Sequence, residues 1–303
     1  MVNFTFRGLM APTLTTFKND LSVNLDVIQD YAKFLADSNI MGVLVNGTSG
    51  EGMSMNVNER KQVTEAWVKA VKKTNQHLMV QIGGAPLPDV LELAKHAESV
   101  GVHSLLCLPD LYNKPTNSSE LIRYLKTVGA AAPNTPLLYY HIPSYTNVNI
   151  HMGQFLNDSV GKIPTFHGIK FTSTALDEGV AAVKANSGKY AVFLGADQLM
   201  AGAYTLGFDS AIATTLNMFP QLGIDILEAV KQSKLDKAKK TQDTLTQVCS
   251  VVTKHGAWVP TMKVAMDLFT PIKVGKAREP LTNITGEQMK EMEATMKTIN
   301  INN

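Results

Sequence analysis

Short apolar segments that alternate with amphipathic ones are the feature of this sequence that most restricts its fold. The apolar runs are continuous rather than alternating with polar residues, which is typical of parallel strands covered on both faces. They lie at residues 9–17, 42–47, 77–84, 103–109, 136–143, 166–172, 190–196 and 210–215. Amphipathic segments with helix start and stop signals lie between them, for example residues 56–73 and 88–101.

This order predicts a (β/α)8 TIM barrel, an α/β fold, over residues 1–220. Residues 221–303 carry helical patterns only, so we expect a C-terminal helical extension packed on the barrel within a single structural domain. The alternative is an open doubly wound sheet. That fold usually carries a glycine-rich nucleotide fingerprint after its first strand, and this sequence has none there.

The composition of the chain limits which kinds of partner the protein can bind and in which compartment we expect it. Apolar residues make up 45 % of the 303 residues and charged residues 18 %, which indicates a compact globular protein. A formal net charge of +2 without any Lys/Arg-rich run argues against nucleic acid and membrane surfaces. No apolar run approaches the roughly 20 residues of a membrane span, and no signal peptide is visible. Cys107 and Cys249 are far apart and indicate free thiols, so we expect a cytoplasmic protein.

Lys170 is the strongest candidate for chemistry, because it interrupts the apolar run 166–172. Lysine is almost never fully buried unless it is paired. One interpretation is a side chain that reaches from a strand end to solvent. The other follows from the barrel, in which active sites lie at the C-terminal ends of the strands. Desolvation depresses the pKa of a lysine, and the neutral amine can attack a carbonyl to give a Schiff base.

Further polar groups occur at other predicted strand ends. The turn N-G-T-S-G-E-G at 46–52 could form an anion-binding nest with the hydroxyls of Thr48 and Ser49, or it could be an ordinary tight turn. It lacks the lysine of a P-loop, which argues against nucleotide binding. We expect Glu51 to be a structural hydrogen-bond partner rather than a general acid.

Tyr139 and Tyr140 are neighbours on one predicted strand, so their rings point to opposite faces, and parity alone does not select one. His141 and His167 lie near this region and are expected to be structural. No group of His, Cys and carboxylate residues has metal-ligand spacing, so we expect no metal.

Three motifs together resemble the N-acetylneuraminate lyase and dihydrodipicolinate synthase superfamily. They are G-T-S-G-E at 47–51, Y-H-I-P at 140–143 and G-I-K-F-T at 168–172. The resemblance runs over essentially the whole chain, including the helical tail. It implies a pyruvate-dependent class I aldolase on a (β/α)8 barrel, usually a homotetramer. It also implies that no cofactor is needed, because the lysine itself supplies the electron sink.

The resemblance assigns roles by position. Lys170 would form the Schiff base, Tyr140 would shuttle protons, and Thr48 and Ser49 would hold the substrate carboxylate. Other positions would bind the rest of the substrate or lie near a subunit interface. The substrate positions are Thr172, Gly195, Asp197, Gln198 and Thr214, and the interface aromatic is Tyr112.

The resemblance also favours one branch of the superfamily. Tyr145 stands where synthases usually carry an arginine, which favours the sialic acid lyases and hence cleavage of N-acetylneuraminate to N-acetylmannosamine and pyruvate. Two departures concern the pocket: Gln198 follows Asp197 where these lyases commonly have Glu, and Ala213 stands where Gly is common. The alternatives are an aldolase for another 2-keto-3-deoxy sugar acid, a non-catalytic keto-acid-binding homologue, and a barrel that binds phosphate after strands seven and eight.

Overall fold

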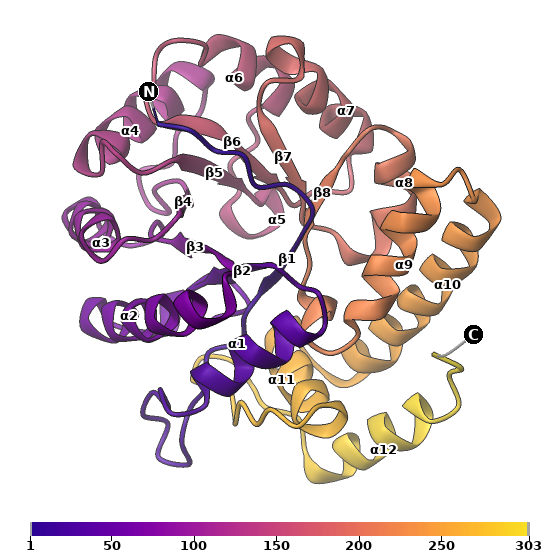
Figure 1. The fold of residues 1–303 in the computed structure, drawn as a ribbon. Helices are drawn as coiled ribbons and strands as arrows, with labels where there is room; N and C mark the ends of the chain where they lie inside the picture. Colours follow the sequence, from indigo (N-terminus) through magenta and orange to yellow (C-terminus); the bar gives the residue numbers. More distant parts are fainter. Residues whose placement is uncertain (1, 302–303) are drawn as a thin grey trace.

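The computed structural model describes residues 2–301 and contains a closed barrel of eight parallel strands in sequence order (Figure 1). Each strand pairs with the next, and β8 pairs with β1 to close the sheet. The strands are β1 (Leu9–Pro12), β2 (Gly42–Val45), β3 (His77–Gln81), β4 (Ser104–Cys107), β5 (Leu137–His141), β6 (Phe166–Phe171), β7 (Ala191–Leu194) and β8 (Ser210–Ile212). The predicted (β/α)8 TIM barrel is therefore confirmed.

Helices follow the strands and surround the sheet (Figure 1). The helices between strands are α1 (Ile28–Asp37), α2 (Val57–Thr74), α3 (Leu87–Val100), α4 (Ser118–Ala131), α5 (Pro143–Thr146), α6 (Met152–Asp158), α7 (Leu176–Lys184) and α8 (Met200–Thr205). The helix start at residue 56 has a local cause, since Asn56 caps α2 and forms a capping box with Glu59.

Strand side chains are divided between two hydrophobic layers, because successive residues point to opposite faces. One layer fills the barrel interior, and the other lies between the sheet and the helices. The interior layer includes Met10, Leu44, Met79, Leu106, Leu138, Tyr140, Phe193 and Ile212. Burial on both faces explains why the strands are continuous apolar runs in the sequence.

All eight predicted strands occur, but the first is shorter than its run of residues 9–17. It ends at Pro12, after which the chain leaves the barrel. The N–H of Phe17 donates to the carbonyl of Val274 at 3.0 Å, and Phe17 forms an isolated antiparallel bridge with Val23. Phe17, which suggested a longer strand, is buried beside Lys263 and Arg278 of the C-terminal segment instead.

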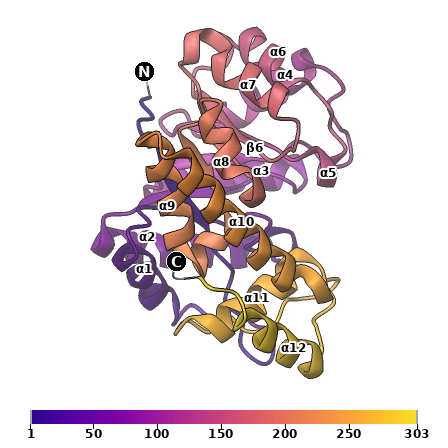
Figure 2. The ribbon, with the colours of Figure 1, turned by 90° about the vertical axis from the view of Figure 1, so that its right-hand side faces the viewer.

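The end of the chain is helical, as predicted, and its helices pack along one side of the barrel (Figure 2). They are α9 (Pro220–Lys231), α10 (Leu235–Val252), α11 (Trp258–Phe269) and α12 (Gly286–Met296). Helix α9 begins at the predicted boundary and packs against both α8 and α10. The division into residues 1–220 and 221–303 stays a prediction.

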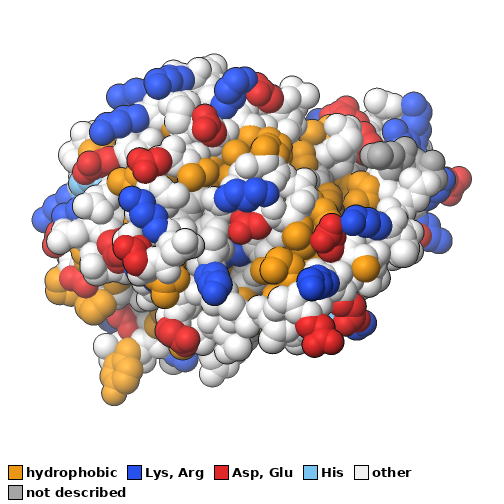
Figure 3. Space-filling model, turned by 90° about the horizontal axis from the view of Figure 1, so that it is seen from below, with side chains coloured by type: hydrophobic (Ala, Val, Ile, Leu, Met, Phe, Trp, Pro, Cys, Tyr) orange, Lys and Arg blue, Asp and Glu red, His pale blue; other side chains and the backbone are white. Residues whose placement is uncertain are grey.

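The surface carries charges of both signs. On the face shown in Figure 3, Lys and Arg side chains are intermixed with Asp and Glu and form no field of one sign. This agrees with the small formal net charge of +2. Within residues 2–301, every helix is too short or too polar to span a bilayer.

Candidate active site

A cavity of about 570 Å³ opens at the C-terminal ends of the strands. The nine residues assigned to catalysis or substrate binding all line it, although they come from five different strand ends. They are Thr48 and Ser49 after β2, Tyr140 on β5, Lys170 and Thr172 on or after β6, Gly195, Asp197 and Gln198 after β7, and Thr214 after β8. The barrel therefore places residues far apart in the sequence around one space.

Lys170 is buried inside the barrel, with 5 % of its surface exposed. It lies beside Tyr140 in the register of β5 and β6. Its Nζ donates to the Tyr140 Oη at 3.0 Å and lies 4.2 Å from the centre of that ring. None of the ion pairs within residues 2–301 includes Lys170. The amine therefore faces the cavity in direct contact with a phenol and without an ion-pair partner, which is a suitable setting for a nucleophile.

The structure decides between the two tyrosines. Tyr140 belongs to the interior layer, whereas Tyr139 points outward, and its ring centre lies 5.7 Å from that of Phe155 on α6. Burial raises the pKa of Tyr139 further above its ordinary value. Tyr139 is therefore a packing residue, and only Tyr140 reaches the amine of Lys170.

Hydroxyl groups form two hydrogen-bonded pairs at the cavity wall. Thr48 Oγ1 lies 3.2 Å from Tyr140 Oη, and Ser49 Oγ lies 2.8 Å from Thr214 Oγ1. The indole Nε1 of Trp258 donates to Thr214 Oγ1 at 3.1 Å. Because an indole N–H can only donate, the bond from Trp258 uses neither hydroxyl proton of Ser49 and Thr214. The bond between Ser49 and Thr214 uses one of these two protons. The other proton stays available to an anion in the cavity.

Gly195 creates space beside the lysine. A Cβ on Gly195 would lie 1.9 Å from Thr172 Oγ1 and 3.1 Å from Lys170 Cε, so a larger residue would displace these side chains. The hydroxyl of Thr172 is buried and has no hydrogen-bond partner in the described part of the chain. Such a group at a cavity wall is suited to bind a polar ligand.

Asp197 and Gln198 differ in exposure although they are adjacent. Asp197 is buried, and its Oδ1 accepts hydrogen bonds from the N–H and hydroxyl of Thr215 at 2.8 and 2.7 Å. Burial raises the pKa of Asp197, while the bonds from Thr215 and the nearby Lys170 act in the opposite direction. Gln198 is exposed at the cavity mouth. A ligand in the cavity would therefore meet a buried, hydrogen-bonded carboxyl group at Asp197 and a solvent-exposed amide at Gln198.

Other candidate residues lie outside this cavity. Tyr112 is 93 % exposed and lines a separate surface hollow of about 900 Å³. His141 stacks on Phe171 behind the strand, and burial lowers its pKa to about 4, so the ring is neutral. His167 lies near Phe4. Neither histidine lines the cavity, in agreement with a structural role.

The sequence patterns did not identify every residue of the cavity wall, and Trp258 and Tyr145 are two of those that they missed. Trp258 begins α11 in the C-terminal extension and reaches the cavity only through the tertiary fold. Tyr145, which stands where synthases usually carry an arginine, lines the same cavity. No local signal identifies Trp258, because its contact with Thr214 joins positions 44 residues apart.

Comparison with known proteins places this arrangement in a family. A model of the dihydrodipicolinate synthetase family matches residues 5–299. The chain belongs to this family. The N-acetylneuraminate lyase of Rattus norvegicus is 34 % identical over 296 residues, covering 97 % of this chain and 92 % of the rat protein. The N-acetylneuraminate lyase of Homo sapiens is 33 % identical over 295 residues, covering 97 % of this chain and 92 % of the human protein.

Solved structures of the family agree with the fold. The N-acetylneuraminate lyase of Proteus mirabilis superposes with a TM-score of 0.92 at 32 % identity, covering 98 % of this chain and 99 % of that one. The N-acetylneuraminate lyase (sialic acid aldolase) of Aliivibrio salmonicida superposes with a TM-score of 0.94 at 31 % identity, covering 99 % of this chain and 99 % of that one. The three motifs on which the family resemblance depends all reach the cavity of Lys170. The resemblance to this superfamily is therefore confirmed.

Proposed function

We propose that this protein is a class I aldolase that cleaves N-acetylneuraminate to N-acetylmannosamine and pyruvate through a Schiff base on Lys170. The observation that carries the proposal is the contact of 3.0 Å between Lys170 Nζ and Tyr140 Oη inside a cavity of about 570 Å³. The similarity to proteins named N-acetylneuraminate lyase supports the choice of substrate.

The first half of the proposed reaction forms the imine. The amine of Lys170 attacks C2 of the open-chain keto acid, and the C2 oxygen leaves as water after it accepts a proton from the Tyr140 phenol. The hydroxyls of Thr48 and Ser49 donate to the substrate carboxylate. Charge on the departing oxygen is neutralised within the site, where a positioned proton donor is worth roughly 10²–10⁴-fold in rate.

The second half breaks the C3–C4 bond. Its electron pair moves into the protonated imine, and the Tyr140 oxygen takes the proton of the C4 hydroxyl as that carbon becomes the aldehyde of N-acetylmannosamine. The same proton then passes to C3 of the enamine. Water hydrolyses the resulting imine and releases pyruvate and the free amine of Lys170. Protons and electrons balance with one lysine and one phenol.

The remaining polar groups would bind the sugar part of the substrate. We assign this role to Thr172, Gly195, Asp197, Gln198 and Thr214, which line the cavity beyond Lys170. A shorter 2-keto-3-deoxy sugar acid is the second candidate substrate. It is favoured by the exposed amide of Gln198, which offers no charge to the hydroxyls of a long tail.

Borohydride trapping tests the proposal. Reduction in the presence of pyruvate should attach a reduced pyruvyl group to Lys170 and inactivate the enzyme. Lys263 is a matched internal control, because it is also buried but is ion-paired with Glu51 at 2.7 Å, and it should stay unlabelled. Lys170→Ala should abolish cleavage, and Lys170→Arg should not restore it because a guanidinium stays protonated.

A coupled pyruvate-release assay over a panel of keto acids tests the substrate. Release from N-acetylneuraminate supports the proposal, whereas release only from shorter keto-deoxy acids replaces it by the second candidate. Trapping at another lysine, or at none, would show that the class I mechanism is wrong.

The proposal includes assembly and compartment. We place the protein in the cytoplasm as a homotetramer, with Tyr112 at a subunit interface. The exposure of 93 % for a tyrosine ring supports the interface, and the two free, buried cysteines suit a reducing compartment. Light scattering of the wild type and of Tyr112→Asp would test the assembly, because a charge at that interface should lower the mass of the particle.

A further inference from the structure

The loop after β2, residues 46–52, has a backbone shape that needs support. Asn46 and Glu51 have left-handed conformations with φ of 59° and 50°. Asn tolerates this region, but Glu has no local compensation, and such conformations persist only where the surroundings hold them. The loop closes on itself through bonds from Glu51 N to Thr48 O and from Gly52 N to Gly47 O, both 3.1 Å. The same loop carries the hydroxyls of Thr48 and Ser49.

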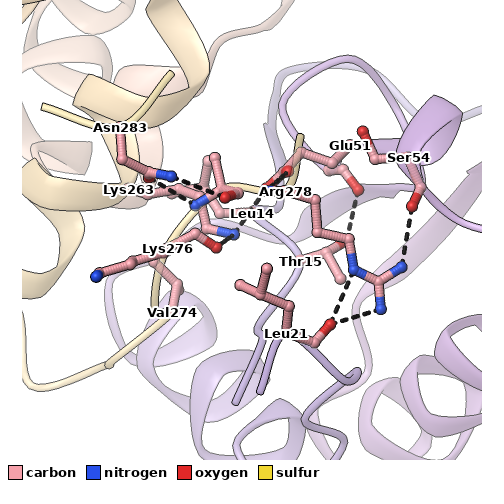
Figure 4. A network of polar contacts seen from close by, with 12 residues as sticks. Leu14, Thr15, Leu21, Glu51, Ser54, Lys263, Val274, Lys276, Arg278 and Asn283 are labelled. Atoms are coloured by element: carbon pink, nitrogen blue, oxygen red, sulfur yellow. Dashed lines mark hydrogen bonds and ion pairs between the residues drawn. The ribbon is translucent and has the colours of Figure 1, made fainter. Parts of the chain in front are cut away.

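The support comes from the C-terminal extension (Figure 4). Lys263 of α11 donates to one Glu51 oxygen at 2.7 Å and to the carbonyl of Lys276 at 3.0 Å. Its Nζ lies 4.2 Å from the centre of the Phe17 ring. The N–H of Arg278 donates to the other Glu51 oxygen at 2.8 Å. The Glu51 and Lys263 side chains are 0 % and 1 % exposed. Both carboxylate oxygens are thus held from a segment more than 200 residues away in the sequence.

Arg278 fixes the same segment from its other side (Figure 4). Its guanidinium donates to the carbonyls of Leu21 and Ser54. It also pairs with Glu59 at 2.6 and 3.0 Å. The central carbon of its guanidinium also lies 4.4 Å from the centre of the Phe17 ring, the same ring that Lys263 Nζ approaches to 4.2 Å. The backbone N–H that meets Glu51 therefore belongs to a firmly anchored residue.

Stability alone does not explain a buried ion pair at this place. Replacing such a pair by well-packed uncharged residues is often neutral or stabilising, whereas removing one partner leaves a costly unpaired charge. A buried ion pair does fix the position of its groups, because its hydrogen bonds determine where the carboxylate lies. Here these bonds hold the Glu51 side chain in place, and with it the adjoining peptides of the loop.

We propose that Glu51 and Lys263 are positioning residues that hold the hydroxyls of Thr48 and Ser49 in place for the substrate carboxylate. The proposal rests on the proposed function, in which these hydroxyls bind that carboxylate. The C-terminal extension is then part of the binding apparatus, although neither Glu51 nor Lys263 lines the Lys170 cavity.

The test uses the double variant Glu51→Gln/Lys263→Met, which removes both charges together and leaves no unpaired one. We expect it to fold, as judged by thermal unfolding, and to bind pyruvate roughly ten- to hundredfold more weakly in borohydride trapping at Lys170. This range is the effect of losing one hydrogen bond to a charged group. The KM for N-acetylneuraminate should rise by the same factor, because both ligands share the carboxylate, while kcat changes little.

The matched control is Lys254→Met/Glu291→Gln. This pair also lies in the extension and has the same chemistry, but it is exposed and does not touch the loop. It should leave trapping and KM unchanged. Wild-type half-saturation by pyruvate in a folded Glu51→Gln/Lys263→Met variant would overturn the proposal, and so would an equal loss in the control.

A milder variant covers the case in which the double variant does not fold. Phe17→Leu removes the ring beneath Lys263 without unpairing a charge. Half-saturation by pyruvate should rise by about two- to fivefold, the value of an ordinary cation–π contact. No rise would overturn the proposal. Failure of the proposed function is distinguishable, because the wild type itself would then not be trapped at Lys170.

Discussion

Replacing Trp258 by phenylalanine isolates one hydrogen bond at the cavity wall. The ring keeps most of its bulk, but the donor that meets Thr214 Oγ1 at 3.1 Å is lost. Thr214 is also bonded to Ser49 at 2.8 Å, so the indole sets how this hydroxyl pair presents its free proton to the cavity. We expect the change to weaken binding of the substrate carboxylate without touching Lys170 or Tyr140.

The size of the effect follows from the kind of bond. A neutral hydrogen bond contributes about 0.5–1.5 kcal/mol net, which corresponds to roughly two- to thirteenfold in affinity. The pair contacts a part of the substrate that does not change during the reaction, so ground state and transition state lose equally. KM should therefore rise by roughly two- to thirteenfold while kcat stays nearly constant.

Steady-state kinetics on N-acetylneuraminate and half-saturation of pyruvate trapping are the two assays. The chain contains two tryptophans, and the other provides the matched control. Trp67 is 2 % exposed and packs edge-on against Tyr31, at 5.5 Å between ring centres. Trp67→Phe should lower the melting temperature but not move KM. An unchanged KM in Trp258→Phe, or the same KM shift in both variants, would refute the reasoning.

Three further predictions address the proton shuttle, the substrate tail and acid stability. Tyr140→Phe should lower kcat by roughly 10²-fold or more, whereas Tyr139→Phe should cost far less, and turnover assays of both variants would expose a reversed assignment. Gln198→Glu should lower KM for N-acetylneuraminate by about two- to fivefold and leave a keto-deoxy acid without the tail unaffected, because a charged acceptor gains roughly 1 kcal/mol over a neutral one; equal changes for both substrates would contradict a role in tail binding. Burial, reinforced by the nearby His103, lowers the pKa of His77 from its ordinary value of 6.5 to about 3. Between these two pH values the unfolded chain binds more protons than the folded one, so the free energy of unfolding falls as the pH drops from 6.5 towards 3. Denaturant titrations at pH 6.5 and 5 should show this loss reduced by roughly 2 kcal/mol in His77→Gln, and an identical loss in the wild type and this variant would contradict the shifted pKa.

The sequence by itself determined the architecture and the cluster of candidate residues. Strands buried on both faces must be continuous apolar runs, and eight of them followed by helices close into one kind of barrel. Because parallel strands end at the same rim, polar residues after five separate runs had to meet there. Lys170 was detectable because an amine in the middle of an apolar strand is costly to bury and therefore conspicuous.

Only the tertiary structure decided which groups act together. The period of a strand separates Tyr139 from Tyr140 but does not say which one faces the barrel interior, and the register with Lys170 settles it. The contact of Trp258 with the cavity and the pairing of Lys263 with Glu51 join the extension to loops of the barrel. Local periodicity and turn chemistry record neighbours within a few residues. These two contacts join positions 44 and 212 residues apart, so they depend on how the finished helices pack, and a single sequence carries no separate signal for them.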